Sequence, residues 1–95
     1  MDFRTTELLG LKIVVADDDA PTRLFLKDVL ENQFGHQILG EAATGPDMVQ
    51  AVEALEPDLV VFDIHLPHQD GLAALVEIYR KRSVAAVAKS SGCHS

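Results

Sequence analysis

The chain has 95 residues, eight of them basic and fifteen acidic, and carries a formal net charge of −7. This length allows one small domain, and the acidic balance argues against direct nucleic-acid binding, because phosphate contacts need a basic face. At 47% hydrophobic residues, the chain is too apolar to be a charged disordered tail.

Cysteine content and apolar runs bear on the cellular compartment. The single cysteine, Cys93, excludes an internal disulfide and suits a reducing compartment. The apolar runs are too short to cross a bilayer, and the start of the chain lacks the basic-then-apolar pattern of a signal peptide. We therefore expect a cytoplasmic domain without a membrane partner.

The first expected elements are an arm, a strand and a helix. Residues 1–10 have no clear period and are predicted to form an N-terminal arm. The β-branched run Leu11–Ala16 predicts a buried strand, and three aspartates follow it directly. The helix that comes next is expected to start near Asp19 or Ala20 and to end at Gly35. Its apolar pairs at a spacing of four are Phe25 with Val29 and Leu26 with Leu30.

A second strand, a second helix and a third strand repeat this alternation. Gln37–Ala42 predicts a short strand, and the sequence Gly45-Pro46-Asp47 opens a helix that Pro57 ends. The next strand, Asp58–Asp63, is apolar on both faces, as a central parallel strand should be. The apolar face of the second helix is expected to consist of Met48, Val52 and Leu55.

The last expected elements are a loop, a third helix and a fourth strand. The loop covers Ile64–Asp70, and Gly71 leads into the helix, whose cationic last turn suits the helix dipole. Ser83–Ala88 predicts the fourth strand, and residues 89–95 are expected to form a polar tail. The third helix is expected to bury the residues at i, i+3, i+4 and i+7, which are Leu72, Leu75, Val76 and Tyr79.

Strand and helix alternate three times before the last strand. This order predicts an α/β fold, a doubly wound parallel sheet of about four strands with three helices on its two faces, joined by right-handed crossovers. The functional crevice of such a sheet lies beyond the carboxyl ends of its strands. Asp17 and Asp18 follow the first strand and Asp63 ends the third, so the three carboxylates meet if these strands are neighbours. Their mutual repulsion calls for a cation, and Mg²⁺ is the ion that this oxygen chemistry favours.

Three motifs carry a resemblance to a known family. They are K-I-V-V-A-D-D-D at the first strand, P-D-L-V-V-F-D at the third strand, and D-I-H-L-P-H-Q-D-G in the loop that follows. With them the chain resembles the receiver domain of two-component response regulators, which has the CheY-like, or flavodoxin-like, fold. The resemblance runs from Lys12 to about Ala88, so a receiver domain is expected over residues 11–88. It also implies that the first strand lies between the second and the third.

The resemblance implies a role for each acidic residue. Asp63 is expected to be the phosphoacceptor, a carboxylate nucleophile that takes a phosphoryl group from a histidine kinase or a phosphotransfer protein. Asp18 is expected to bind Mg²⁺ directly and Asp17 partly through water, while the backbone carbonyl of His65 completes the protein ligands. The domain would act through protein–protein interaction, and its only catalysis would be phosphoryl transfer to itself and autodephosphorylation.

The chain departs from the family in its last part. A receiver normally continues with a fourth helix, a fifth strand and a fifth helix, whereas this sequence stops near the end of the fourth strand, so we expect a truncated domain. Ser90, or Ser91, is the nearest hydroxyl to the family's phosphate-sensing position on the fourth strand; the alternative is a solvated tail serine. Lys89 comes too early to be the family's strand-five lysine and is not assigned. An open strand-four edge favours association, so we expect a homo-oligomer formed through that edge.

Other interpretations stay open at this point. Asp17 and Asp19 form an Asp-x-Asp pair of the kind that haloacid-dehalogenase-type phosphatases place after a first strand, although those enzymes need further motifs. Pro67 and Gly71 either shape the loop that aims Asp63 or are ordinary loop residues. The chain is alternatively a receiver-derived interaction or dimerisation module, or a fragment without productive phosphorylation. A zinc site is a further alternative, and its ligands would be His65, His68, Asp63 and Asp70.

Overall fold

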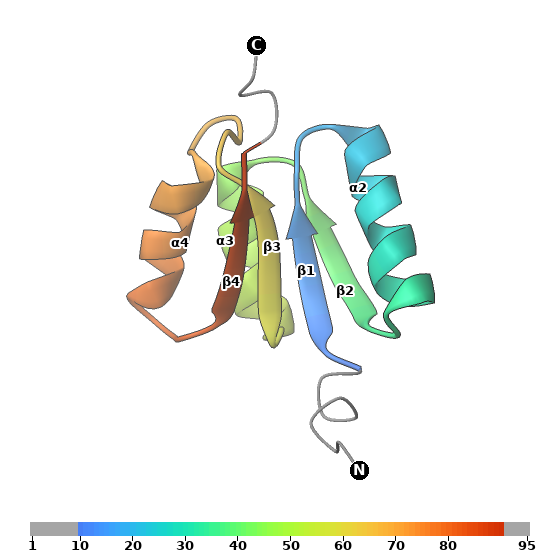
Figure 1. Cartoon of the computed structure of the whole chain (residues 1–95). Coiled ribbons are helices and arrows are strands. Elements are labelled where there is room, and N and C mark those ends of the chain that lie inside the picture. Colours follow the sequence, from blue (N-terminus) through green and yellow to red (C-terminus); the bar gives the residue numbers. More distant parts are fainter. Residues whose placement is uncertain (1–9, 91–95) are drawn as a thin grey trace.

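Four parallel strands form one sheet in the order β2-β1-β3-β4 in the computed structural model, which describes residues 10–90. The doubly wound α/β fold is confirmed, with α2 on one face of the sheet and α3 and α4 on the other (Figure 1). The strands are β1 (Lys12–Ala16), β2 (Gln37–Ala42), β3 (Leu59–Asp63) and β4 (Ala85–Lys89). The helices are α2 (Ala20–Asp28) with its continuation η1 (Val29–Gln33), α3 (Gly45–Leu55) and α4 (Gly71–Tyr79).

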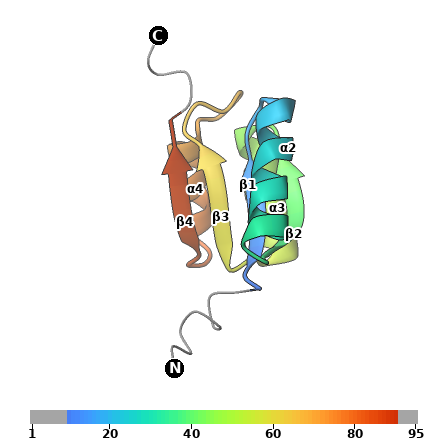
Figure 2. The same ribbon diagram turned by 45° about the vertical axis from the view of Figure 1, so that its right-hand side comes forward.

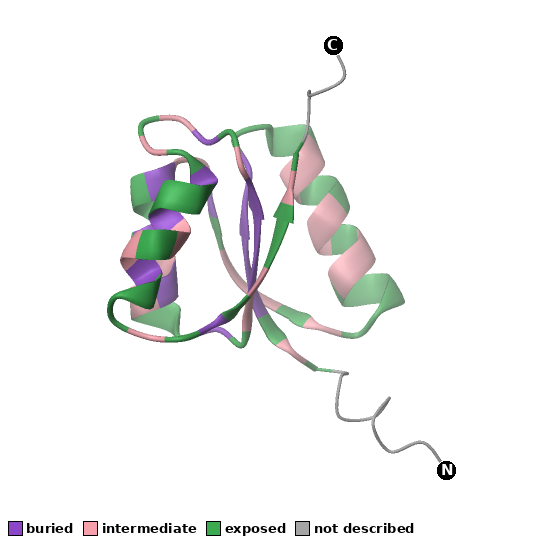
Figure 3. Cartoon of the chain, turned by 60° about the vertical axis from the view of Figure 1, so that its left-hand side comes forward, coloured by how far each residue is buried: buried purple, intermediate pink, exposed green. Residues whose placement is uncertain are grey.

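The larger part of the core lies between the sheet and the pair α3 and α4. Met48 and Val52 of α3 and Ile78 of α4 are fully buried in one cluster with Val14 and Val60 of the central strands. Figure 3 shows the buried residues concentrated in the central strands and on the helices of this face. Because β1 and β3 are covered on both faces, they read as continuous apolar runs in the sequence.

The opposite face of the sheet carries a smaller cluster under α2 and η1. Ile13 and Val15 of β1 and Val61 of β3 are buried here, and Leu26 and Leu30 pack against them. No residue of α2 is itself buried. This helix therefore covers its face less completely than α3 and α4 cover theirs.

The helices α2, α3 and α4 each begin at a side-chain cap. Asp19, Thr44 and Asp70 each accept a hydrogen bond from a backbone N–H three residues later. Asp19 was among the caps predicted from the sequence. These bonds satisfy amides that have no partner within the helix and fix where each helix leaves the carboxyl edge of the sheet.

The buried face of α4 differs from the predicted one. The residues of α4 that pack inward are Gly71, Ala74 and Ile78, with Leu75 partly buried. The other three residues of the predicted face are about half exposed, and they are Leu72, Val76 and Tyr79. Helix α4 is apolar on nearly all sides, so the spacing of its apolar residues does not determine which face is buried. The small residues Gly71 and Ala74 face inward, because they let the helix approach the sheet closely.

The first predicted helix also differs in its second half. The α-helix ends at Asp28 and continues as the π-helix η1, and Gly35 beyond it has a left-handed φ of 74°. Leu26 and Leu30 face the sheet as expected, but Phe25 is 66% exposed. The apolar spacing in the sequence does not distinguish a π-helical turn from an α-helical one, and π-helical turns are rare.

Strand β4 lies further along the chain than predicted. It covers Ala85–Lys89 rather than Ser83–Ala88, so Lys89 belongs to the sheet and not to a polar tail. The pairing with β3 sets these bounds, because it runs from Leu59 beside Ala85 to Asp63 beside Lys89. Figure 2 shows β4 at the edge of the sheet.

Some predictions fall outside the described residues. These are the arm up to residue 9, Ser91, Cys93 and the rest of the tail. Among residues 10–90, the helices are all too short or too polar to span a membrane.

Candidate functional site

The three predicted carboxylates meet at the carboxyl edge of the sheet. Asp17 directly follows β1, and Asp63 is the last residue of β3, the strand beside it. Asp17 and Asp63 are buried, with 1% and 2% of their surface exposed, whereas Asp18 is exposed. One ligand oxygen from each residue lies within 4.8 Å of the other two. The sequence prediction that these side chains converge is therefore confirmed as geometry.

Backbone amides hold the two buried carboxylates in the same way. Asp17 Oδ1 accepts a hydrogen bond from the N–H of Asp19 at 2.8 Å, and Asp63 Oδ1 accepts one from the N–H of His65 at 2.9 Å. In both cases the donor lies two residues later, as in an Asx turn. Each Oδ1 is thus fixed to its own loop.

Lys89 reaches these two carboxylates from β4. Its ammonium forms an ion pair with Asp17 Oδ2 and lies 3.8 Å from Asp63 Oδ2. The Oδ2 atom of Asp17 is buried and accepts no hydrogen bond within residues 10–90, so the ammonium is its counter-ion there. Lys89 was placed in the polar tail from the sequence and was given no role, because it comes too early to be the family's strand-five lysine. The register between β3 and β4 places Lys89 at the site, because it pairs this residue with Asp63.

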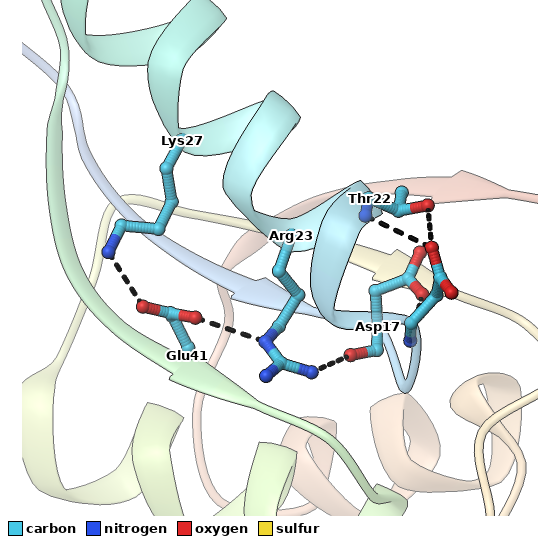
Figure 4. A network of polar contacts seen from close by, with 6 residues as sticks. Asp17, Thr22, Arg23, Lys27 and Glu41 are labelled. Carbon is cyan, nitrogen blue, oxygen red and sulfur yellow. Dashed lines mark hydrogen bonds and ion pairs between the residues drawn. The ribbon is translucent and has the colours of Figure 1, made fainter.

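A second polar network supports the loop after β1 from the side of α2 (Figure 4). Arg23 donates from Nη1 to the carbonyl oxygen of Asp17 at 2.7 Å and from Nε to Glu41 Oε1 at 3.0 Å. Lys27 donates to the other oxygen of Glu41 at 2.7 Å. These hydrogen bonds, with that from Lys27 the largest cause, hold the pKa of Glu41 below its usual value. The network links α2, β2 and the loop that carries the acidic residues.

Gly71 allows the loop after β3 to close tightly on the site. Its N–H donates to the carbonyl oxygen of Ile64 at 2.7 Å. A Cβ at this position would lie 2.3 Å from the carbonyl oxygen of Asp63 and 2.5 Å from Phe62 Cδ2. Of the two interpretations of Gly71, loop shaping is therefore the one that the packing supports.

Comparison with known proteins identifies the family. A family model described as the response regulator receiver domain matches residues 13–92. The chain belongs to this family.

The relatives of this receiver domain differ in name and in the share of their length that the match covers. A protein-glutamate methylesterase/protein-glutamine glutaminase of Geobacter metallireducens is 39% identical over 80 residues, which are 84% of this chain and 23% of that protein. Chemotaxis protein CheY of Thermotoga maritima is 35% identical over 72 residues, 76% of this chain and 59% of that protein. The response regulator domain of Thermotoga maritima CheB superposes with a TM-score of 0.82 at 32% identity, over 86% of this chain and 61% of that one. The chain thus spans about a quarter to three-fifths of the length of these relatives.

The acidic residues of this receiver domain fit a divalent cation. Three carboxylates from two loops offer hard oxygen ligands, which are the donors that Mg²⁺ prefers. Asp17 Oδ2 is buried without a hydrogen bond in the described part of the chain and is paired there with the Lys89 ammonium, so its surroundings already hold a positive charge. The donor set therefore suits Mg²⁺ better than a softer metal.

The remaining predicted site residues lie around this cluster. His65 is exposed and contributes its backbone N–H to Asp63, and its carbonyl as a metal ligand stays a prediction. Ser90 is exposed just beyond the end of β4, and the place beside Asp63 on that strand is taken by Lys89. Within the described part of the chain, the cluster with metal-ligand geometry contains neither His65 nor His68, so the zinc alternative gains no support.

Proposed function

We propose that this receiver domain accepts a phosphoryl group on Asp63 in a Mg²⁺-dependent reaction, with a histidine kinase or a phosphotransfer protein as the donor. The observation that carries the proposal is the position of Asp63 at the end of a central strand, within 4.8 Å of Asp17 and Asp18 oxygens. Membership of the receiver family supports it. The output would be a change in protein–protein interaction.

Each residue has a definable part in this reaction. The N–H of His65 orients the Asp63 carboxylate through Oδ1, so Oδ2 is the oxygen proposed to attack the phosphorus atom. A new O–P bond forms an acyl phosphate as the bond from phosphorus to the donor breaks and the donor keeps that electron pair. Asp17, Asp18, Asp63 and the carbonyl of His65 would hold Mg²⁺. When bound, this ion supplies charge neutralisation at the transferred phosphoryl oxygens.

Phosphorylation by a small donor tests the proposal directly. The chain is incubated with acetyl phosphate in the presence of Mg²⁺ or of EDTA, and intact mass is measured. We expect the mass of one phosphoryl group, labile to hydroxylamine, with Mg²⁺ only. Asp63→Asn should abolish the adduct, while Asp58→Asn, an exposed carboxylate before the same strand, should leave it unchanged. An adduct that persists in Asp63→Asn, or none in the parent chain, would contradict the proposal.

We also propose that the 95-residue chain self-associates through β4. Within residues 10–90 this strand pairs with β3 on one side, and its Val87 is 51% exposed. Exposed strand edges and apolar faces favour association. Sedimentation should show a dimer or larger species at micromolar concentration that Val87→Lys shifts to monomer. A compact monomer of the parent chain would rule this out.

A further inference from the structure

The charge balance of the acidic site depends on a residue that the family motifs do not include. Lys89 is the last residue of β4, in register with Asp63, and 24% of its side chain is exposed. Its ammonium pairs with Asp17 Oδ2 and lies 3.8 Å from Asp63 Oδ2. The two most buried carboxylates of the site thus share one cation that is part of the chain.

We propose that Lys89 is an internal counter-ion that competes with the divalent cation for Asp17. Without metal, its ammonium offsets one of the two negative charges of the buried pair Asp17 and Asp63. Metal binding displaces the ammonium from Asp17 and leaves it beside Asp63. This inference rests on the proposed metal-dependent function of the site, and it adds a residue that sets how tightly the metal binds.

The first reason is the cost of two buried carboxylates. Asp17 and Asp63 are almost fully inaccessible to water, and like charges at this separation repel. Removing one partner of a buried ion pair is strongly destabilising, because the other charge stays buried without compensation. Lys89 therefore supports the fold whenever metal is absent.

The second reason is that the ammonium and the metal need the same carboxylate, that of Asp17. Any ion held by Asp17, Asp18 and Asp63 together must approach oxygens that lie within 4.8 Å of one another. The Lys89 ammonium already contacts Asp17 Oδ2 in that space. Two cations at this distance repel by an energy that is large compared with thermal energy, so one must move. Lys89 moves more easily, because its stem is flexible and 24% of its side chain is exposed.

Three variants of the 95-residue chain test this competition. Lys89→Met keeps most of the stem and removes the charge, Lys89→Arg keeps the charge, and Lys12→Met removes a lysine at the opposite end of the sheet. Thermal unfolding is followed in EDTA and in a Mg²⁺ series, and Mg²⁺ affinity is measured by calorimetry. In EDTA we expect Lys89→Met to unfold about 10 °C or more below the parent chain. We expect it to bind Mg²⁺ about tenfold more tightly, with a larger stabilisation by the metal.

The controls separate the competition from a general loss of stability. Lys12→Met should match the parent chain in Mg²⁺ affinity, and Lys89→Arg should keep most of the stability in EDTA. If Lys89→Met folds only when Mg²⁺ is present, the inference is supported, because the metal then replaces the missing charge. A Lys89→Met chain with unchanged unfolding in EDTA, unchanged or weaker Mg²⁺ binding, or no folding even in Mg²⁺ overturns it. Phosphorylation is scored separately by mass, so a chain that shows the competition but accepts no phosphoryl group would refute only the proposed function.

Discussion

The tight contact between Gly71 and the end of β3 makes a sharp prediction about the variant Gly71→Ala. The added Cβ would lie 2.3 Å from the Asp63 carbonyl oxygen, whereas ordinary van der Waals contact begins near 3.4 Å. The start of α4 or the end of β3 must therefore move by roughly 1 Å, the difference between these two distances. That movement strains the hydrogen bond from Gly71 to Ile64 and shifts the phosphoacceptor residue.

Two opposing effects set the size of the change. Replacing glycine by alanine in a helix ordinarily stabilises by up to about 1 kcal/mol. Overpacking of a close contact costs about 1–3 kcal/mol, and here the neighbouring atoms are backbone and an aromatic ring in the core. We expect the overpacking cost to exceed the gain in helix propensity, and Gly71→Ala to lose about 1–2 kcal/mol net, or very roughly 4–16 °C in Tm for a domain of this size.

Gly40→Ala is the matched control. There the new Cβ meets only Leu55 Cδ1, the end of a half-exposed side chain that can rotate away. Urea unfolding of both variants, with phosphorylation by acetyl phosphate as a second measurement, compares the same substitution against a rigid and a flexible neighbour. Gly71→Ala with stability equal to or above that of the parent chain would refute the reasoning, as would a greater loss in Gly40→Ala.

Three further predictions concern the core, a cap and the acid response. Ile78→Ala should lower the free energy of unfolding by about 2–5 kcal/mol, measured by urea denaturation, because the side chain is fully buried between α4 and the sheet. Asp70→Ala should cost about 1 kcal/mol in the same assay through the lost N-cap of α4, and Asp70→Asn should retain most of that stability. The lowered pKa of Glu41 means that its bonds to Lys27 and Arg23 stabilise the fold above the ordinary value of 4.5 and are lost as pH falls through the lowered pKa. Glu41→Gln should therefore cost stability near neutral pH, by about 1 kcal/mol or less for such a surface pair, and the difference from the parent chain should shrink below pH 4.5.

The order of elements was readable because each signal was local. Apolar runs such as Leu59–Asp63 end in acidic residues, and caps such as Asp19 and glycines such as Gly35 separate them from helices. The neighbouring positions of β1 and β3 came from the family resemblance, and they brought Asp17 and Asp63 together as expected. The buried face of α4 was misassigned, because Val76 and Ile78 are equally apolar and only tertiary packing decides between them.

Lys89 shows why the site was only partly predictable. Side chains alternate between the two faces of a sheet along a strand, so a small error in the placement of β4 changes which residue stands beside Asp63. The alanine-rich run before Lys89 offers only Val84 and Val87 as larger apolar residues, which is too few to mark its register. Ser90 was therefore assigned to a position that the pairing of β3 with β4 gives to Lys89.

The formal charges of the site indicate how Lys89 would affect both metal binding and phosphorylation. Three carboxylates and one ammonium leave the metal-free pocket with a formal charge of about −2, which one divalent cation would neutralise. Phosphorylation of Asp63 would replace a single negative charge by roughly two. The ammonium displaced from Asp17 is then the nearest uncommitted positive charge on β4, since it already lies 3.8 Å from Asp63 Oδ2. Lys89 would therefore weaken the binding of the divalent cation and stabilise the phosphorylated form of Asp63.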